Sequence, residues 1–289
     1  MPNWVQQRVV AREPQILKKF LVNEDGEVDF NMAIPKPKDL EIMSGSYSYE
    51  TPSRYGFFAE ETKKKLQEQM PIEKEFKAIY NDTITQDEFF NKVMANEKLL
   101  KKIREFKGWS LRKTALNPYS MKKSAILEAY NCYIRGFFNL QRYGERDWYE
   151  WSITNWGTKW NASDGFVNAD GSIEFQTAWS MPEPIFREIS KHTPLRVVYA
   201  DEDMGNNCGM EDYFYQDGES HMERIMDESM ELACDTWGYS CVPAYDVDWN
   251  ELGEDTEQFK EKNKDYFQIQ EEIRTLMTTE CLKKDFAEV

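Results

Sequence analysis

The chain has 289 residues, of which 40% are hydrophobic and 14% aromatic, so it can bury a substantial core and is not a disordered sequence. It contains no apolar run of 18 residues and no signal peptide with a basic start and an apolar centre, which excludes a membrane span and predicts a cytoplasmic protein. The five cysteines form no close pair and are odd in number, so we expect reduced thiols rather than a disulfide framework.

Charge is distributed unevenly along the chain. The formal net charge is −16, and residues 201–289 carry 25 acidic and 7 basic side chains. Residues 92–123 carry ten basic and two acidic side chains. An acidic field repels nucleic acid and attracts basic protein surfaces, although a simple solvated surface has the same composition.

The N-terminal part alternates between strand and helix patterns. Residues 4–12 mix β-branched and polar side chains, which predicts a strand. Pro14 fits the first turn of a helix, and apolar residues at helical spacing follow it. The alternation over Val28–Ile34 predicts a second strand, and residues 42–59 are typical of a tyrosine-rich loop.

Helical patterns dominate residues 60–143. Thr85, with Glu88 three residues later, matches a capping box at the start of one helix. Ser120 is expected to cap a further helix that ends near Gly144. The basic cluster lies across these helices and the link between them.

Strand patterns return after the helical region. The elements expected there are strands at 148–162, 172–179, 193–203 and 211–218, a helix capped by Ser180, an acidic helix at 219–238 and a long polar helix at 256–286.

Without the helical region, the elements run strand, helix, strand, twice over. This order is typical of a ferredoxin-like split βαβ arrangement, in which an antiparallel sheet carries two helices on one face. The sequence therefore predicts an α+β fold with a helical insertion between its halves and an acidic helical C-terminal extension. The expected parts are a ferredoxin-like domain at 1–59 and 144–215, a basic insertion at 60–143 and the acidic region at 216–289.

Several segments, in this order, resemble a known family. They are MPNWVQQRVV, FNMAIPKPKDL, NWGTKWNA, IEFQTAWSMPEPIFREIS and VVYADEDMGNNCG, within residues 1–40 and 150–209. The set resembles the YubB-type ferredoxin-like family carried by phages and conjugative plasmids. The resemblance implies a ferredoxin-like fold in a mobile-element protein without an established enzymatic activity. Members often have cysteine where this chain has Val5, so no role for a cysteine carries over.

Motifs of catalysis and metal binding are absent from the sequence. It has two histidines and no GxGxxG, Walker, HExxH or GxSxG pattern. A zinc site would have to use Cys208, His221, Cys234 and Cys241, whose spacing lacks the short paired loop of structural sites. The DEDMGNN stretch departs from the EF-hand pattern. We therefore expect no enzyme, no metal and no cofactor.

The stretch NWGTKWN has two interpretations. In the structural one, Gly157 permits a left-handed turn, and Trp156 and Trp160 pack on the sheet or on Trp179. In the functional one, Trp156, Lys159 and Trp160 form a platform for a ligand or a nucleotide base.

The charge pattern and the resemblance together predict an interaction protein. It would bind and inhibit a host defence machine, a restriction or CRISPR-type nuclease, through an acidic surface that mimics nucleic acid. Its partner would be a basic host protein or protein–nucleic-acid complex, and its oligomeric state is left open. The predicted acidic contacts are Asp201, Glu202, Asp203, Glu211, Asp212, Asp217, Glu219, Glu223, Asp227, Glu228, Glu231 and Asp235. The predicted aromatic anchors are Tyr213, Phe214, Tyr215 and Trp237.

Two alternatives remain open at this point. One is a nucleic-acid-binding accessory protein that contacts phosphates through the basic insertion. Its contacts would be Lys92, Lys98, Lys101, Lys102, Arg104, Lys107, Arg112 and Lys113. The other is a nucleotide or small-molecule sponge that uses the aromatic turn.

Overall fold

The computed structural model describes residues 3–44, 71–103, 123–203, 207–238 and 264–287. Contacts divide the chain into two compact units. We call Met1–Pro35 together with Ser152–Val289 the sheet unit, and Lys36–Trp151 the helical unit.

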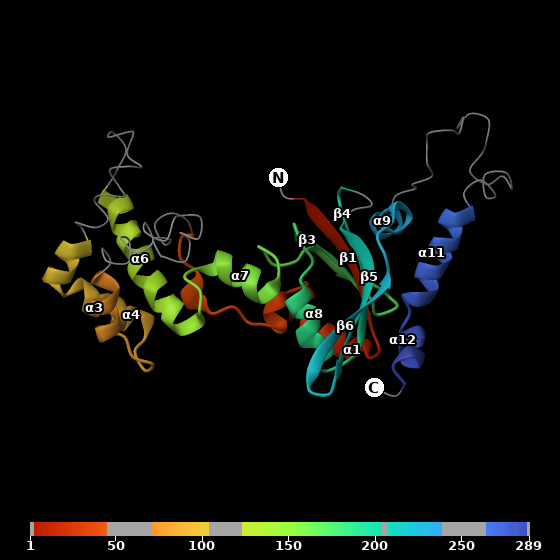
Figure 1. Ribbon diagram of the computed structural model, residues 1–289, viewed down its shortest axis with the longest axis horizontal. Coiled ribbons are helices and arrows are strands. Elements are labelled where there is room, and N and C mark those ends of the chain that lie inside the picture. The colour runs from red at the N-terminus through yellow and green to blue at the C-terminus, as the bar shows by residue number, and fades with distance from the viewer. Residues whose placement is uncertain (1–2, 45–70, 104–122, 204–206, 239–263, 288–289) are drawn as a thin grey trace, which may run out of the picture. The chain divides into compact units, whose positions relative to one another are not determined.

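The sheet unit is built on one open sheet (Figure 1). Within the described residues it has six strands in the order β2-β3-β1-β4-β5-β6, and all neighbours are antiparallel. The strands are β1 (Trp4–Ala11), β2 (Ser163–Val167), β3 (Ile173–Ala178), β4 (Leu195–Asp201), β5 (Cys208–Gln216) and β6 (Glu219–Met226). β4 is buried at every position, whereas β2 and β6 form the edges.

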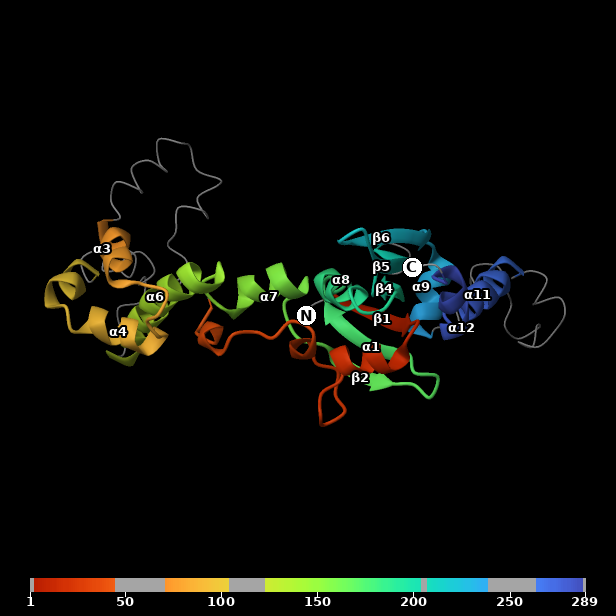
Figure 2. The same cartoon turned by 90° about the horizontal axis from the view of Figure 1, so that it is seen from below.

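Helices cover both faces of this sheet (Figures 1 and 2). They are α1 (Pro14–Leu21), α8 (Glu183–Ser190), α9 (Met230–Trp237), α11 (Lys264–Leu276) and α12 (Thr279–Asp285). α1 and α8 lie on one face, where the rings of Phe186 and Tyr213 are 5.5 Å apart. α9, α11 and α12 lie on the other, where Leu232, Ile273 and Leu282 join a core with Val198.

The predicted ferredoxin-like α+β fold is confirmed. β1, α1, β2, β3, α8 and β4 follow one another in the sheet unit, and the order β2-β3-β1-β4 is that of the split βαβ arrangement. β5 and β6 extend the sheet beyond β4 as a hairpin.

The second strand of this fold is not where the alternation placed it. Val28–Ile34 contains a 3-10 helix, η1 (Phe30–Met32), because Asp29 Oδ1 accepts hydrogen bonds from Asn31 N at 2.9 Å and from Asn161 Nδ2 at 2.8 Å. The structure provides β2 only after the helical unit. The helical unit therefore separates α1 from β2.

The aromatic stretch predicted as a strand at 148–162 begins with a helix, α7 (Trp148–Trp156). The buried carboxylate of Asp147 accepts a hydrogen bond from Tyr149 N at 2.9 Å, as a helix-capping residue does. Gly157 follows the helix with a φ of +79°, which confirms the predicted left-handed turn.

The acidic stretch predicted as a helix at 219–238 is helical only in α9. Asp217 and Gly218 have φ values of +54° and +88°, which fit a two-residue hairpin turn that pairs β6 with β5. Ser229 then caps α9 and accepts a hydrogen bond from Leu232 N at 3.1 Å.

Two other helix boundaries differ from prediction. Pro182, not Ser180, is the N-cap of α8, because Ser180 Oγ donates a hydrogen bond to Gly157 O at 2.5 Å. The long final helix is divided into α11 and α12, because Thr278 accepts a hydrogen bond from Cys281 N at 3.2 Å and starts a new helix.

The helical unit has an aromatic core. Its described helices include α3 (Pro71–Ile79), α4 (Gln86–Met94) and α6 (Lys123–Tyr143), and η2 (Lys38–Leu40) precedes them. Phe76, Phe89 and Phe137 pack together within this core.

Two local signals in the helical unit are confirmed within its described residues. Thr85 and Glu88 form the predicted capping box, and Gly144 ends α6 with a φ of +80°. Ser120 and most of the predicted loop at 42–59 lie outside the described residues. The two units also differ from the boundaries expected at residues 59, 143 and 215, since η2 belongs with the helices and α11–α12 pack on the sheet. No helix in the described ranges is long and apolar enough to cross a membrane.

Candidate functional site

Some of the predicted acidic contacts are interior residues. Asp212 is buried and accepts hydrogen bonds from Arg196 Nε at 2.6 Å and Arg196 Nη2 at 2.7 Å. Burial raises the pKa of Asp212, and Arg196 opposes that rise. Arg196 also bonds Asp285 of α12 at 2.8 Å and the carbonyl of Leu276 at 3.0 Å. Asp212 therefore fixes the C-terminal helices to the sheet and is not a surface contact.

Glu211 is buried on the opposite face of the sheet. Its carboxylate accepts hydrogen bonds from Tyr199 at 3.2 Å, Tyr213 at 2.6 Å and Arg224 at 2.6 Å. Burial raises the pKa of Tyr199 to about 12 and also raises that of Tyr213. Tyr213 is fully buried, so neither it nor Glu211 is available as a partner contact.

Asp201 is also buried, at the end of β4. Its carboxylate accepts hydrogen bonds from Asp203 N at 3.0 Å and from Asn207 Nδ2 at 3.1 Å, and its carbonyl accepts one from Trp237 Nε1 at 3.0 Å. Asp201 shapes the β4–β5 turn, and Trp237 is half-buried beside it. Glu231 and Asp235 of α9 are likewise only partly exposed.

The exposed acids lie mainly along the edge strand β6. Glu202 and Asp203 are exposed in the β4–β5 turn. The others follow β6 from its first turn to the link with α9, and we call them the acidic edge: Asp217, Glu219, Glu223, Asp227 and Glu228. The sequence predicted all of these as surface residues, and the structure brings this subset to one side of the sheet.

The remaining predicted aromatic anchors differ in exposure. Tyr215 is exposed on β5 beside the acidic edge. Phe214 is half-buried, because its ring stacks on His221 at 5.4 Å and contacts Phe286 at 5.4 Å. Tyr215 is therefore the member of this set that is best placed for a partner.

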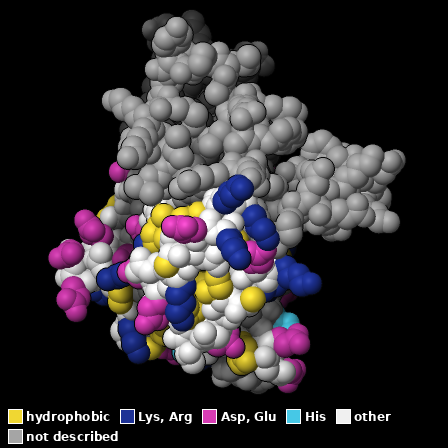
Figure 3. All heavy atoms as spheres, turned by 90° about the vertical axis from the view of Figure 1, so that its left-hand side faces the viewer, with side chains coloured by type: hydrophobic (Ala, Val, Ile, Leu, Met, Phe, Trp, Pro, Cys, Tyr) yellow, Lys and Arg dark blue, Asp and Glu magenta, His cyan; other side chains and the backbone are white. Residues whose placement is uncertain are grey.

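The predicted basic contacts are only partly described. Lys92, Lys98, Lys101 and Lys102 are exposed in the helical unit, and Lys102 pairs with Glu75. On the face shown in Figure 3, Lys and Arg side chains are mixed with acidic and hydrophobic ones. The others lie outside the described residues: Arg104, Lys107, Arg112 and Lys113.

The two tryptophans of NWGTKWN have different environments. Trp156 is buried and donates a hydrogen bond to Ile34 O at 2.9 Å, so it faces the core. Trp160 is exposed and lies 6.2 Å from Trp4 and 5.5 Å from Trp179 between ring centroids. Lys159 Nζ lies 4.5 Å from the centre of the Trp160 ring. Sequence reasoning missed Trp4 in this cluster and treated Trp179 only as a packing partner.

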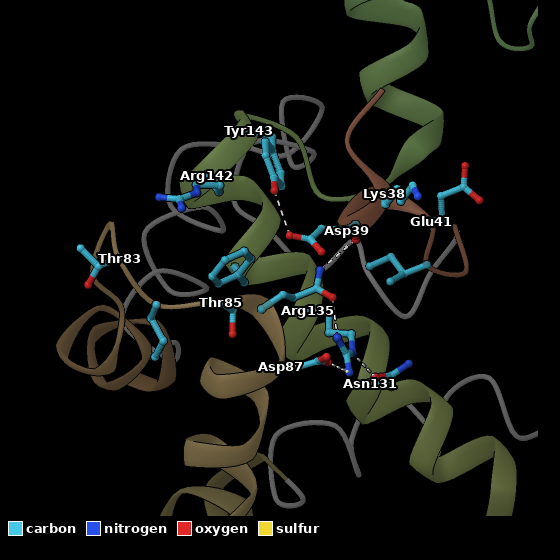
Figure 4. A pocket seen from close by; sticks show the side chains of 14 residues that line it. Lys38, Asp39, Glu41, Thr83, Thr85, Asp87, Asn131, Arg135, Arg142 and Tyr143 are labelled. Atoms are coloured by element: carbon cyan, nitrogen blue, oxygen red, sulfur yellow. Dashed lines mark hydrogen bonds and ion pairs between the residues drawn. The ribbon is translucent and has the colours of Figure 1, made fainter. Parts of the chain in front are cut away.

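A pocket of about 540 Å³ lies within the helical unit (Figure 4). Arg135 projects from α6 between Asp87 and Asn131, and its Nη2 lies 2.7 Å from Asp87 Oδ1. Tyr143 donates a hydrogen bond to Asp39 Oδ2 at 2.8 Å. No motif in the sequence indicated this pocket.

Buried amides below the pocket explain its polar lining. Gln86 Nε2 donates to Asn139 Oδ1 at 2.7 Å, and both amides donate to Asp39 O. Arg135 Nη1 donates to Gln86 Oε1 at 2.5 Å. These contacts attach η2 to α4 and α6. The charged lining is balanced, with cations and carboxylates in equal number: Lys38, Arg135 and Arg142, and Asp39, Glu41 and Asp87. We therefore assign no ligand to this pocket.

Cys241, one of the residues considered for zinc, lies outside the described residues, and the other three have different environments. Cys208 is a buried free thiol that donates to Ser229 O at 3.5 Å, and burial raises its pKa. His221 is exposed on β6. Cys234 is disulfide-bonded, which corrects the expectation of reduced thiols throughout. Among the described side chains, no group of three or more His, Cys, Asp or Glu is placed to hold a metal ion.

The fold and these surfaces define a ferredoxin-like α+β domain with an acidic strand at one edge. Residues 155–240 match a family model described as a ferredoxin-like domain in Api92-like protein. This range runs from the end of α7 past the end of α9. Searches of curated proteins and of solved structures gave no match. The comparison supports the ferredoxin-like part of the resemblance seen in the sequence, and the YubB-type label is not confirmed.

Proposed function

We propose that the chain is an interaction protein of a mobile genetic element that binds a basic surface of a host defence nuclease and inhibits it. The observation that carries this proposal is the acidic edge. Its exposed carboxylates follow one edge strand, and Glu219 and Glu223 are four residues apart, so their side chains share a face of the sheet about 13 Å apart.

The negative field of this edge has little local compensation. Arg224 is the only Lys or Arg in the sequence between Asp201 and Trp237. Its guanidinium is held by Glu211 at 2.6 Å and by the Tyr199 hydroxyl at 2.6 Å, and its Nε lies 3.9 Å from Asp227 of the acidic edge. Arg187 of α8 also donates a hydrogen bond to Ser220 O on β6 at 2.9 Å. Carboxylates still outnumber these cations, and a basic groove made for nucleic acid is attracted to a surface with net negative charge.

Apolar side chains on the other face of the same hairpin can add contact area for a partner that encloses the edge. Tyr215 and Met222 are exposed on the α8 face, whereas Glu219 and Glu223 lie on the α12 face. Exposed aromatic and methionine side chains are enriched at protein interfaces, where charges provide steering and apolar residues provide affinity.

A charge-neutral variant tests the proposal. We expect the wild-type chain to raise the plating of a phage on a host with a defined restriction or CRISPR defence, and not on a host without it. Glu219→Gln/Glu223→Gln/Asp227→Asn removes exposed charges that are each worth about 0.2–1 kcal/mol, which weakens inhibitor binding by about 3- to 150-fold.

The matched control is Glu24→Gln/Asp25→Asn/Glu27→Gln, which removes the same charge from the exposed turn after α1. The control should inhibit as well as the wild-type chain. The proposal fails if the wild-type chain protects phage from none of these defences, or if both triple variants lose protection equally.

A further inference from the structure

Trp179 has a backbone conformation that bulky residues rarely adopt. It follows β3 directly and has a φ of +66°. In this left-handed region the side chain of an L-residue crowds the backbone, so an aromatic residue there is a genuine outlier. Such strain persists where neighbouring contacts enforce it, and it is concentrated at functional sites.

Neighbouring hydrogen bonds hold this strained turn. Trp179 N donates to Asn3 O at 2.8 Å, and Thr177 Oγ1 donates to Ser180 O at 2.7 Å. Thr158 Oγ1 donates to Ala178 O at 2.9 Å. The turn is therefore rigid on both sides of Trp179.

The strain places an indole in solvent instead of in the core. Trp179 is 48% exposed and Trp160 is 37% exposed, and their ring planes are tilted by 36°. The Lys159 ammonium lies 4.5 Å from the centre of the Trp160 ring and 5.1 Å from that of Trp179. Because the Trp179 ring is exposed, burial of apolar surface does not account for its backbone conformation. The Lys159 ammonium lies close to both indole rings.

A polar cavity lies on the face of the sheet to which Trp4 points, one residue pair further along β1 and β3. Trp4 and Gln6 are two residues apart on β1, so their side chains point to one face, and they pair with Ala178 and Gln176 of β3. Gln6 and Gln176 line a cavity of about 380 Å³ that the C-terminal end of α9 closes. This volume lies within the range of small-ligand sites.

We propose that the tryptophan cluster, defined as Trp4, Trp160 and Trp179, binds a nucleobase together with Lys159 and this cavity. An exposed indole offers a stacking surface to a planar base, and the amides of Gln6 and Gln176 offer both donors and acceptors to its edge. Lys159 lies beside the indole rings, where its ammonium group can contact the phosphate of the same nucleotide.

The cavity lining itself argues for this orientation. Glu174 and Asp235 line the cavity together with Arg8, whose Nε lies 3.8 Å from Glu174. Arg8 also pairs with Asp170 at 2.8 Å, so the charged groups of the cavity sum to a negative charge that disfavours a phosphate there. Carboxylates can accept hydrogen bonds from the amino groups of a base. A protein side chain docked on the indoles alone would leave the amide-lined cavity unused. In the proposed complex the edge of the base therefore points into the cavity, and the phosphate lies beside Lys159.

Two sources can supply such a base, and they are distinguished by titration of the full-length chain. The probes are adenosine and cytidine monophosphates, followed by calorimetry, and fluorescein-labelled single-stranded dodecamers, followed by anisotropy. Saturable binding of the monophosphates assigns the site to free nucleotides. Binding of the dodecamers alone assigns it to single strands. The proposal is overturned if neither class binds at millimolar concentration.

The decisive variant is Trp179→Gly, because glycine relieves the positive φ while the ring is removed. We expect it to bind about 5- to 150-fold more weakly, the range for loss of one base–aromatic stack, with an unchanged or higher melting temperature. Phe166→Ala removes another exposed aromatic ring, on edge strand β2, and should bind like the wild-type chain. Equal binding by Trp179→Gly and the wild-type chain would overturn the proposal.

Discussion

The Tyr199 hydroxyl lies in a buried polar cluster on the α8 face of the sheet, where it bonds Glu211 and Arg224. Burial raises its pKa from 10 to about 12. The folded state therefore favours the neutral phenol, and the stability this contributes is complete below pH 10 and is lost as pH rises toward 12. We expect Tyr199→Phe to reduce the loss of stability between pH 10 and 12, measured as the denaturant midpoint at each pH.

The comparison for this prediction is Tyr215→Phe, which changes an exposed phenol on the neighbouring strand. This variant controls for the loss of a phenol hydroxyl as such. Identical curves for Tyr199→Phe and the wild-type chain would contradict the role given to Tyr199.

Residue environments were predictable where they depend on close neighbours in the sequence. Thr85 and Glu88 cap α4 as expected, because a capping box needs only four residues. The burial of Asp212 was not predictable, because this sheet is covered on both faces and successive side chains are then buried alike. The different burial of Trp156 and Trp160 was not predictable for a related reason. Tertiary packing alone places Trp156 in the core and leaves Trp160 exposed.

At the scale of elements, Arg196 joins β4 to the last two helices. It contacts Asp212 on β5, the carbonyl of Leu276 at the end of α11 and Asp285 on α12. Arg196→Met leaves Asp212 as an unpaired buried charge, so we expect a loss of about 3–5 kcal/mol in the free energy of unfolding. Urea denaturation measures this loss.

A double variant shows whether the loss of stability in Arg196→Met comes from the unpaired buried charge or from altered packing. Arg196→Met/Asp212→Leu removes both charges and should recover most of the lost stability. Arg274→Met, at an exposed arginine of α11, should change stability by less than about 0.5 kcal/mol. A double variant no more stable than Arg196→Met would show that the ion pair is not the cause.

The sequence contains a turn signal that indicates a strand, and not a helix, at β6. Asp217-Gly218 between two apolar segments indicates a hairpin, and the structure has both residues at positive φ. The helical spacing of Met222, Ile225 and Met226 pointed the other way. This segment forms a strand because β5 pairs with β6 along its whole length.

At the scale of the whole molecule, the two units have separate cores. The core cluster around Val198 and Leu232 uses only sheet-unit residues, and that around Phe76 and Phe137 uses only helical-unit residues. Replacement of Lys36–Trp151 by a glycine–serine linker should therefore leave a cooperatively folding sheet unit. Calorimetry should show one transition for this variant, and an aggregated product without a transition would contradict the division.

The position of β1 at the centre of the sheet also governs when the protein can fold during its synthesis. Val5 pairs with Thr177 on one side and Asp201 on the other, and no nearer strand serves it among the described elements. At a translation rate of about 5–20 residues per second, β1 leaves the ribosome roughly 10–40 s before its second partner exists. The helical unit has time to form from its own local contacts within that interval. β1 and its valines lack both strand partners for most of that interval, so we expect slower translation to lengthen the time for which this central strand is unpaired.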